Sequence, residues 1–140
     1  MNILSTLMEY AIIDYLDLIE RGVRKLISDY LTNELKSTGK VTMTTEYAWK
    51  CTDVLEVIKF LSDNTYAILG CDVLNDNLSY TYDNWSYTYD KSLTLEKNIE
   101  ESVLKIIEYI DWYSTNFGDN YYYIIVAEKK ADYLLMQENA

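Results

Sequence analysis

The apolar positions of this chain recur at helical spacing in four segments. Residues 4–36 predict one long helix or two stacked helices, and residues 46–62 predict a second helical region. A third apolar stripe runs through residues 95–115, where acidic side chains gather near the expected N-terminus. A short terminal helix is expected over residues 129–137. The first three segments are long enough to be the main helices of the fold.

Three other segments have the character of strands. Residues 66–74 form an almost continuously apolar run, which is typical of a central strand, and residues 121–127 are rich in aromatic and β-branched side chains. Residues 78–90 alternate unevenly around the turn dipeptide at 83–84, which predicts a hairpin or a strand with a bulged corner.

The order of these elements predicts an α+β fold, with a small mixed β-sheet packed against three main helices. We find no linker or internal repeat, so residues 1–140 are expected to form a single domain.

The charge of the chain is strongly acidic and unevenly distributed. The formal net charge is -11, and residues 72–90 and 91–140 each contribute -4. Such a field repels nucleic-acid phosphates and attracts basic proteins, so we expect a protein partner and no direct nucleic-acid binding. Solubility alone is an equally good explanation of the net charge.

The chain has little catalytic equipment. It contains no His, which removes the commonest general base and metal ligand. Cys51 and Cys71 are too few for a zinc site, and their apolar surroundings predict buried, reduced thiols. The segment 72–77 resembles a calcium loop but lacks its central Gly and terminal Glu. We therefore expect no catalytic residue, no metal and no cofactor, and predict that the protein is not an enzyme.

Targeting signals are not apparent in the sequence. Residues 1–20 lack a basic leading region, and acidic residues interrupt their apolar positions. No run is long and apolar enough to span a bilayer. A cytoplasmic location without a membrane partner is the expectation.

One segment combines acidic and aromatic side chains to an unusual degree. Residues 72–90 contain four Asp, four Tyr and one Trp, with no Lys or Arg, which favours contact with a basic protein. The candidate partner-binding residues are Asp72, Asp76, Tyr80, Tyr82, Asp83, Trp85, Tyr87, Tyr89 and Asp90.

Structural roles are open for some of these candidates. Asp72 could instead hold the backbone beside Gly70, and Trp85 could be a core anchor. For Asp83, turn chemistry alone would suffice. A two-faced ribbon cannot bury all four tyrosines, so at least two of them should be exposed.

Several short motifs occur in an order that resembles immunity protein family 40, a group of bacterial immunity proteins in polymorphic toxin systems. The resemblance covers about residues 44–127. It rests on Tyr47-Ala48-Trp49, on Gly70-Cys71-Asp72-Val73, on Asn84-Trp85, on Ser102 with Tyr109-Ile110, and on Tyr121 to Val126. The family usually has two consecutive glycines before the Asp, and here Cys71 replaces the second. A residue with a Cβ does not adopt a glycine-only conformation cheaply, so the backbone there could differ.

The resemblance implies an immunity protein that binds and neutralises a cognate toxin domain delivered by a neighbouring bacterium, as in contact-dependent growth inhibition. The partner would be the toxin's C-terminal domain, which is expected to be basic, with a nuclease as one candidate activity, and the complex would be stoichiometric. Two alternatives stay open. One is an acidic nucleic-acid mimic that inhibits a DNA-binding protein, and the other is a carboxylate-dependent enzyme. Neither explains the order of the motifs.

Overall fold

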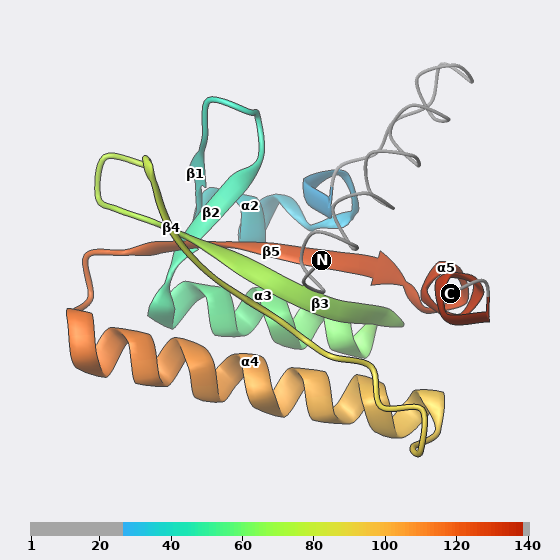
Figure 1. Cartoon of the computed structure of the whole chain (residues 1–140). Coiled ribbons are helices and arrows are strands. Elements are labelled where there is room, and N and C mark those ends of the chain that lie inside the picture. The colour runs from blue at the N-terminus through green and yellow to red at the C-terminus, as the bar shows by residue number, and fades with distance from the viewer. Residues whose placement is uncertain (1–26, 139–140) are drawn as a thin grey trace.

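A five-stranded antiparallel sheet with helices on one face forms the centre of the molecule (Figure 1). The computed structural model describes residues 27–138. The strands, in the sheet order β1-β2-β5-β3-β4, are β1 (Lys40–Val41), β2 (Tyr47–Lys50), β5 (Tyr122–Lys129), β3 (Tyr66–Leu74) and β4 (Tyr80–Ser86). The helical elements are η1 (Ile27–Tyr30), α2 (Asn33–Ser37), α3 (Cys51–Asp63), α4 (Leu95–Phe117) and α5 (Lys130–Glu138).

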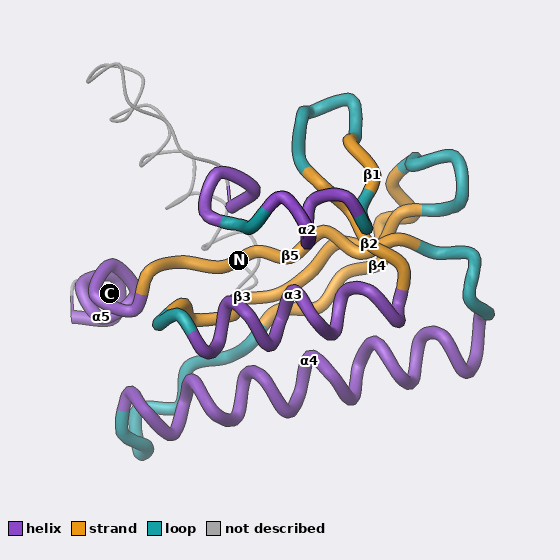
Figure 2. The backbone as a smooth tube through the Cα atoms, turned by 180° about the vertical axis from the view of Figure 1, so that it is seen from behind, coloured by secondary structure: helices purple, strands orange, loops and turns teal. Residues whose placement is uncertain are grey.

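The α+β class is confirmed, and the strand directions are simpler than expected. Every pair of neighbouring strands is antiparallel, whereas the sequence had suggested a mixed sheet. α3 and α4 lie side by side across one face of the sheet, as the view from behind also shows (Figure 2). We call the opposite face, which these two helices do not cover, the open face.

The N-terminal part of the first predicted helix lies outside the described residues. Within residues 27–36, the helical period is interrupted, because η1 ends at Tyr30 and α2 begins after its N-cap Thr32. The side chain of Thr32 accepts a hydrogen bond from the backbone N–H of Leu35. A continuous helix through this part of the chain is therefore wrong.

The predicted helix over 46–62 begins five residues later than expected. Residues 47–50 form β2 instead, in which Trp49 pairs with Tyr123 of β5. The Trp49 indole N–H also donates to the carbonyl of Leu35 at 2.9 Å. Ala48 and Trp49 are both buried, and they belong to different core clusters. Burial on both faces of a strand explains the choice, because a helix would place these neighbours about 100° apart on one surface.

The turn of the hairpin does not lie at residues 83–84, where the sequence predicts it. β3 and β4 form a hairpin whose connection is built on Asn75, whose side-chain oxygen accepts from the N–H groups of Asn77 and Ser79. The alternative of a strand with a bulged corner is the correct one. Asp72 of β3 pairs with Asn84 of β4, and Leu74 pairs with Tyr80. Between these two pairs β4 has more residues than β3, and the extra residues form the bulge.

The strand β3 is buried between β5 and β4, and its pairing with β5 shifts register between Ile68 and Gly70. Tyr66 and Ile68 face the helices before the shift, and Cys71 and Val73 do so after it. An unbroken two-residue alternation would have turned Asp72 toward the core. The bulge therefore places Asp72 on the open face.

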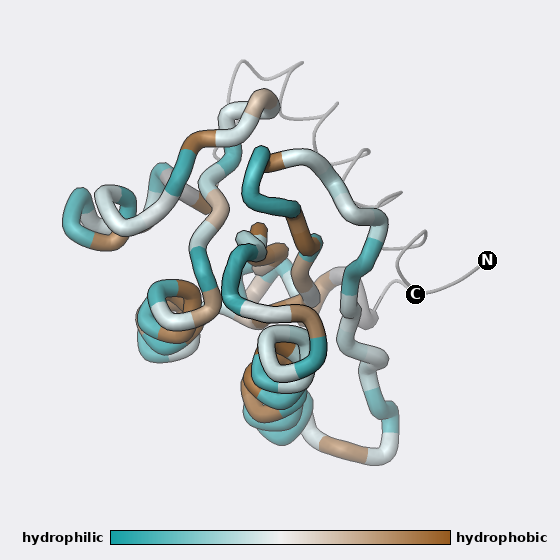
Figure 3. The backbone as a smooth tube through the Cα atoms, turned by 90° about the vertical axis from the view of Figure 1, so that its left-hand side faces the viewer, coloured by the Kyte–Doolittle hydropathy of each residue, from teal (hydrophilic) through white to brown (hydrophobic). Residues whose placement is uncertain are grey.

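The long helix α4 was predicted closely. Thr94 is its N-cap, and its side chain accepts from the N–H of Lys97. Figure 3 looks nearly along α3 and α4, and it shows both helices on the same side of the sheet with apolar and polar residues alternating along their turns. The buried positions of α4 are Asn98, Ser102, Ile106, Ile110 and Tyr113. Their spacing of three to four residues is the reason for a single face packed on the sheet.

Gly70 should be intolerant of any side chain. A Cβ at this position would lie inside the contact distance of the Trp85 carbonyl oxygen, and 3.1 Å from the Cα of Ser86. Because both obstacles are backbone atoms, the two strands would have to separate. We expect Gly70→Ala to lower the free energy of unfolding by at least about 2 kcal/mol, as overpacking does. Urea titration measures this change. Thr88→Ala, at an exposed position, is the control and should change stability by less than about 0.5 kcal/mol. Equal stability of the two variants would contradict the close approach.

Candidate protein-binding surface

The acidic aromatic segment does not form one patch. Residues 72–90 follow the end of β3, the turn, β4 and the connection to α4, and so run along the length of the molecule (Figure 1). Because β4 has two faces, its side chains separate into different environments. Seven of the nine candidate residues therefore fall into three groups, and Asp76 and Tyr82 are exposed at the surface outside them.

The first group lies on the open face of the sheet. Asp72 is half-buried, and this burial raises the pKa of its carboxyl. Tyr80 of β4 stands opposite Leu74, and its hydroxyl lies near the side chain of Thr44. Burial is the main cause that raises the pKa of Tyr80, and the charges of Glu46 and Asp72 add to it. The turn between β1 and β2 and the β3–β4 hairpin thus meet above this face.

The second group faces α4. The Asp83 carboxylate accepts a hydrogen bond from the hydroxyl of Tyr113, with 2.7 Å between the oxygens. Burial and this hydrogen bond raise the pKa of Tyr113 to about 12. Trp85 is half-buried and stacks on Tyr109, with ring centroids 6.4 Å apart. The core interpretation of Trp85 is therefore confirmed, although one side of the residue is still exposed.

The third group lies near the N-terminus of α4 and is occupied with internal contacts. Tyr87 is 7% exposed, and its hydroxyl donates to the Asn98 side chain at 2.7 Å. Tyr89 packs edge-on against Tyr133. Asp90 accepts hydrogen bonds from the side chain and the backbone N–H of Ser92, and these bonds lower its pKa. The structure gives these three candidates structural roles.

Asn98 explains the geometry of the third group. It is fully buried, accepts from the N–H of Asp90, and donates to the carbonyls of Asp90 and Thr94. The segment between β4 and α4 is therefore fastened to the first turn of the helix.

Exposed aromatic side chains remain at the other end of the segment. Tyr80 is 44% exposed and Tyr82 is 90% exposed, which confirms that at least two of the four tyrosines reach the surface. Tyr82 has a φ of 68°, a left-handed conformation that bulky residues rarely adopt. Asp76, in the turn that precedes β4, is also exposed.

The sequence analysis missed two further exposed aromatic residues near the end of α4. Trp112 is 52% exposed and Phe117 is 53% exposed, with their ring centroids 5.8 Å apart. Both rings also contact Tyr113, which binds Asp83. The available signal was that Trp112 falls outside the apolar stripe of the predicted helix. We define the end surface as Asp76, Tyr82, Asp83, Asp111, Trp112 and Phe117.

The cysteines differ from each other. Cys71 is 2% exposed, as predicted, and burial raises its pKa. Cys51 is only half-buried, so the expectation of burial is wrong for this thiol. It begins α3, where its sulfur lies 3.9 Å from a carboxylate oxygen of Asp119. Both cysteines are free.

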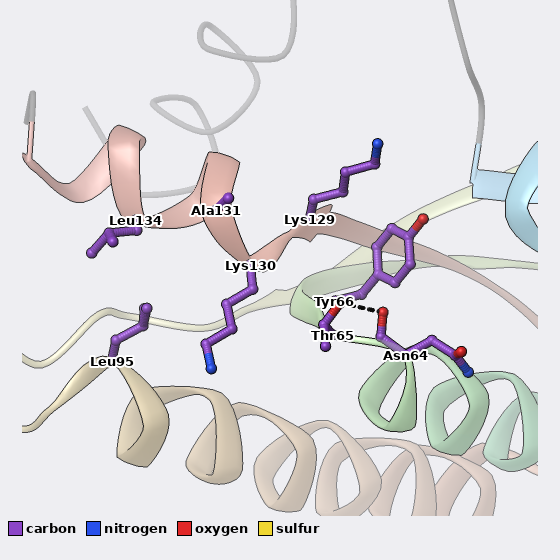
Figure 4. A pocket seen from close by; sticks show the side chains of 8 residues that line it. All are labelled: Asn64, Thr65, Tyr66, Leu95, Lys129, Lys130, Ala131 and Leu134. Atoms are coloured by element: carbon purple, nitrogen blue, oxygen red, sulfur yellow. Dashed lines mark hydrogen bonds between the residues drawn. The ribbon is translucent and has the colours of Figure 1, made fainter.

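A hollow at the opposite end of the molecule offers no catalytic arrangement. It is lined by side chains of β3, β5 and the starts of α4 and α5 (Figure 4). Lys130 forms an ion pair with Glu96, and Lys129 lies over the ring of Tyr30 at 5.2 Å. Both lysines of this hollow thus have intramolecular contacts.

Residues 27–138 contain no group of three or more Cys, Asp or Glu side chains that is placed to hold a metal ion. None of the helices in the same range has the length and apolar character needed to cross a membrane.

Comparison with known proteins identifies one relationship. A family model described as Immunity protein 40 matches residues 34–127. The matched range begins in α2, ends within β5, and contains α3, α4 and the end surface. No curated protein and no solved structure is significantly similar to the chain. Of the motif's two glycine positions, the chain keeps glycine at Gly70, where a side chain would meet the Trp85 backbone. Cys71 has no positive φ, so the replacement there needs no unusual backbone.

The half-buried Asp72 carboxylate should destabilise the fold at neutral pH. Its pKa is raised in the folded state, so between about pH 4 and that raised value the native state holds more protons than the unfolded one. The free energy of unfolding therefore falls as the pH rises through this window, and the loss persists above it. We expect Asp72→Asn to raise the melting temperature at pH 7 and to have little effect at pH 3.

Thermal melting across this pH range measures the effect. Asp76→Asn, at an exposed position, is the control and should leave the pH profile unchanged. A lower melting temperature for Asp72→Asn at pH 7 would mean that the native fold stabilises the charged carboxylate.

Proposed function

This chain belongs to the Immunity protein 40 family, and from that membership we propose that it neutralises a cognate bacterial toxin by forming a stoichiometric complex with it. The family implies an immunity protein that acts against a toxin. The match over residues 34–127 is the observation that carries the proposal, because it includes most of the pairing of β3 with β5 and both large helices.

Inhibition by binding agrees with the chemistry of the chain. The chain has no His, which is the commonest general base. Its half-buried Asp72 lies on the open face near Tyr80, whose hydroxyl in turn lies near Thr44. We propose that the protein has no turnover and protects the cell by covering a functional surface of the toxin. The proposed place of action is the cytoplasm of a bacterium that receives the toxin from a neighbour, as in contact-dependent growth inhibition.

The proposed partner is a basic C-terminal toxin domain, and a nuclease fits this description because its substrate cleft must attract phosphates. The net charge of -11 supports this complementarity. Of the nine residues predicted from the sequence, Asp76, Tyr80, Tyr82 and Asp83 are exposed beside one another along the start of β4 and its turn. We propose that these four contribute to the contact.

The charges at this site should control the rate of association. We expect the double variant Asp76→Asn with Asp83→Asn to associate with the toxin domain about two- to tenfold more slowly at low salt, with a weaker dependence on ionic strength. Dissociation should change less, because exposed charges act mainly on the encounter. Stopped-flow or biolayer measurements with the toxin domain encoded beside the gene of this chain would give both rates.

A matched double variant controls for net charge. Asp63→Asn with Asp132→Asn removes the same charge from exposed positions on α3 and α5. It should slow association less than the first pair does. Equal slowing by both pairs would show that only the total charge matters, and would exclude Asp76 and Asp83 as local contacts.

A further inference from the structure

We propose that the toxin contact extends beyond the acidic segment onto the C-terminal end of α4, where Trp112 and Phe117 are anchors for an Arg- or Lys-bearing face of the toxin. This inference rests on the proposed function and specifies its surface. The two residues that it adds lie outside the acidic segment. Trp112 is 27 positions after Trp85, and Phe117 lies further along the chain.

The exposure of these two rings is the first reason. Trp112 and Phe117 each leave about half of their surface in solvent, at 52% and 53%. Trp is among the side chains that contribute most to protein interfaces, since it buries a large area with few rotatable bonds. Both rings contact the buried Tyr113, yet they leave a contiguous aromatic surface in solvent, and such exposed apolar patches mark sites of protein interaction.

The second reason is that the rings are already ordered. Trp112 lies edge-on to both Phe117 and Tyr113, with centroids 5.8 Å and 6.2 Å away. Tyr113 is 3% exposed and also contacts Phe117, at 4.6 Å. Neighbouring rings restrict the rotamers of Trp112 and Phe117 before any partner arrives. Binding through them therefore loses less conformational entropy than binding through free side chains.

A hydrogen bond joins this ring cluster to the acidic segment. The Tyr113 hydroxyl donates to Asp83, which links the end of α4 to the bulged part of β4. The bulge is held by a bond from the Thr81 hydroxyl to the carbonyl of Val73 and by one from the Asn84 side chain to the carbonyl of Tyr82. Asp83 and Trp112 consequently belong to one connected surface, although they are far apart in sequence.

The backbone of Tyr82 supplies a third observation. Its φ of 68° is unfavourable for a residue with a Cβ, and its side chain is 90% exposed. The fold thus maintains an unfavourable conformation that brings no burial of the ring. Such local strain is concentrated at functional positions, where it presents a side chain to a partner.

Charge determines the chemistry of the occupant. Three of the six residues that define the end surface are acidic, namely Asp76, Asp83 and Asp111, and none of the six is Lys or Arg. A guanidinium or ammonium group of the partner would find carboxylates beside an aromatic face, where cation–π attraction adds to the ionic interaction. A basic protein face therefore fits this surface, and an acidic or phosphate-bearing one does not.

Another exposed apolar pair, on α5, makes a useful contrast. Leu134 and Leu135 on α5 are 38% and 54% exposed, but they follow Lys129 and Lys130 and include no aromatic ring. This pair has similar exposure and a different electrostatic environment. It is therefore the matched control for the ring pair.

The decisive experiment compares two double variants with the same probe. The probe is the purified C-terminal toxin domain encoded beside the gene of this chain. We expect the double variant Trp112→Ala with Phe117→Ala to bind more weakly, with a dissociation constant at least about 100-fold higher. The increase should come mainly from faster dissociation, as it does when interface anchors are lost. Leu134→Ala with Leu135→Ala should change it by less than about threefold. Thermal melting reports whether each variant is folded.

Tryptophan fluorescence tests the surface without relying on the stability of the alanine variant. Trp49 is 2% exposed and Trp85 is half-buried, so Trp112 should dominate acrylamide quenching of the free chain. The quenchable fluorescence component that is missing in the Trp112→Phe variant is the emission of Trp112. Addition of the toxin domain should shield that component from acrylamide if the end surface is covered.

The outcomes separate this inference from the proposed function. Tight binding by the unsubstituted chain, with unchanged affinity of the ring variant and unshielded Trp112, would leave the function in place and overturn the surface. If the ring variant unfolds, the shielding of Trp112 decides the question alone. No binding by the unsubstituted chain would overturn both the proposed function and the surface that depends on it.

Discussion

A bulge at Gly70, in the pairing of β3 with β5, determines on which side of the sheet the following residues lie, and at the same residue the backbone of β3 closely approaches that of β4. Trp85 and Ser86 of β4 occupy the space where a side chain of residue 70 would be. The bulge formed there shifts the alternation of β3, so Cys71 enters the core and Asp72 does not. A carboxylate in the main core would have cost several kcal/mol. The sequence Gly70-Cys71-Asp72-Val73 is thus compatible with a buried central strand only because the register changes at its first residue.

The same strand pairing connects the core to the surface that we assign to the toxin. Cys71 is paired with Trp85, which stacks on Tyr109 of α4. One turn further along the helix, Tyr113 binds Asp83. The position of the end surface therefore depends on packing between β3, β4 and α4, and a change in the core would be transmitted to it. A binding surface supported in this way is rigid, which favours tight association.

Some elements of the fold could be predicted from the sequence, because their pattern of apolar residues allowed only one interpretation. Residues 66–74 are apolar except for Asp72, as expected of a strand largely covered on both faces, and the helix over 95–115 has one clear stripe. The segment 47–50 was misassigned because its apolar residues fit either period over so few positions. Its strand character comes from pairing with β5, which lies more than 70 residues away. Local propensity carries no information about such a partner.

The candidate surface was predictable only in part, for a related reason. Composition located the acidic aromatic segment, and Tyr80 and Tyr82 are exposed as that composition required. It could not show that Tyr87 would be buried against Asn98, because both residues are polar enough for a surface. Nor could it join Trp112 to Asp83, since that neighbourhood arises when Tyr113 of α4, which contacts the Trp112 ring, donates its hydrogen bond to Asp83 of β4. Sequence identifies the kinds of side chain, whereas their grouping depends on tertiary contacts.

Hydrogen exchange of the intact complex is the most direct test of the central claim, which is that a toxin is bound at the end of the molecule formed by β4 and the last turns of α4. The amides of Tyr80 to Asn84 lie on an edge strand, and those of residues 111–121 include the end of the helix and its loop. Our account predicts that adding the toxin domain slows exchange in these two segments and leaves α5 unchanged. Protection confined to α5, or to α2 and the neighbouring face of α3, would contradict it.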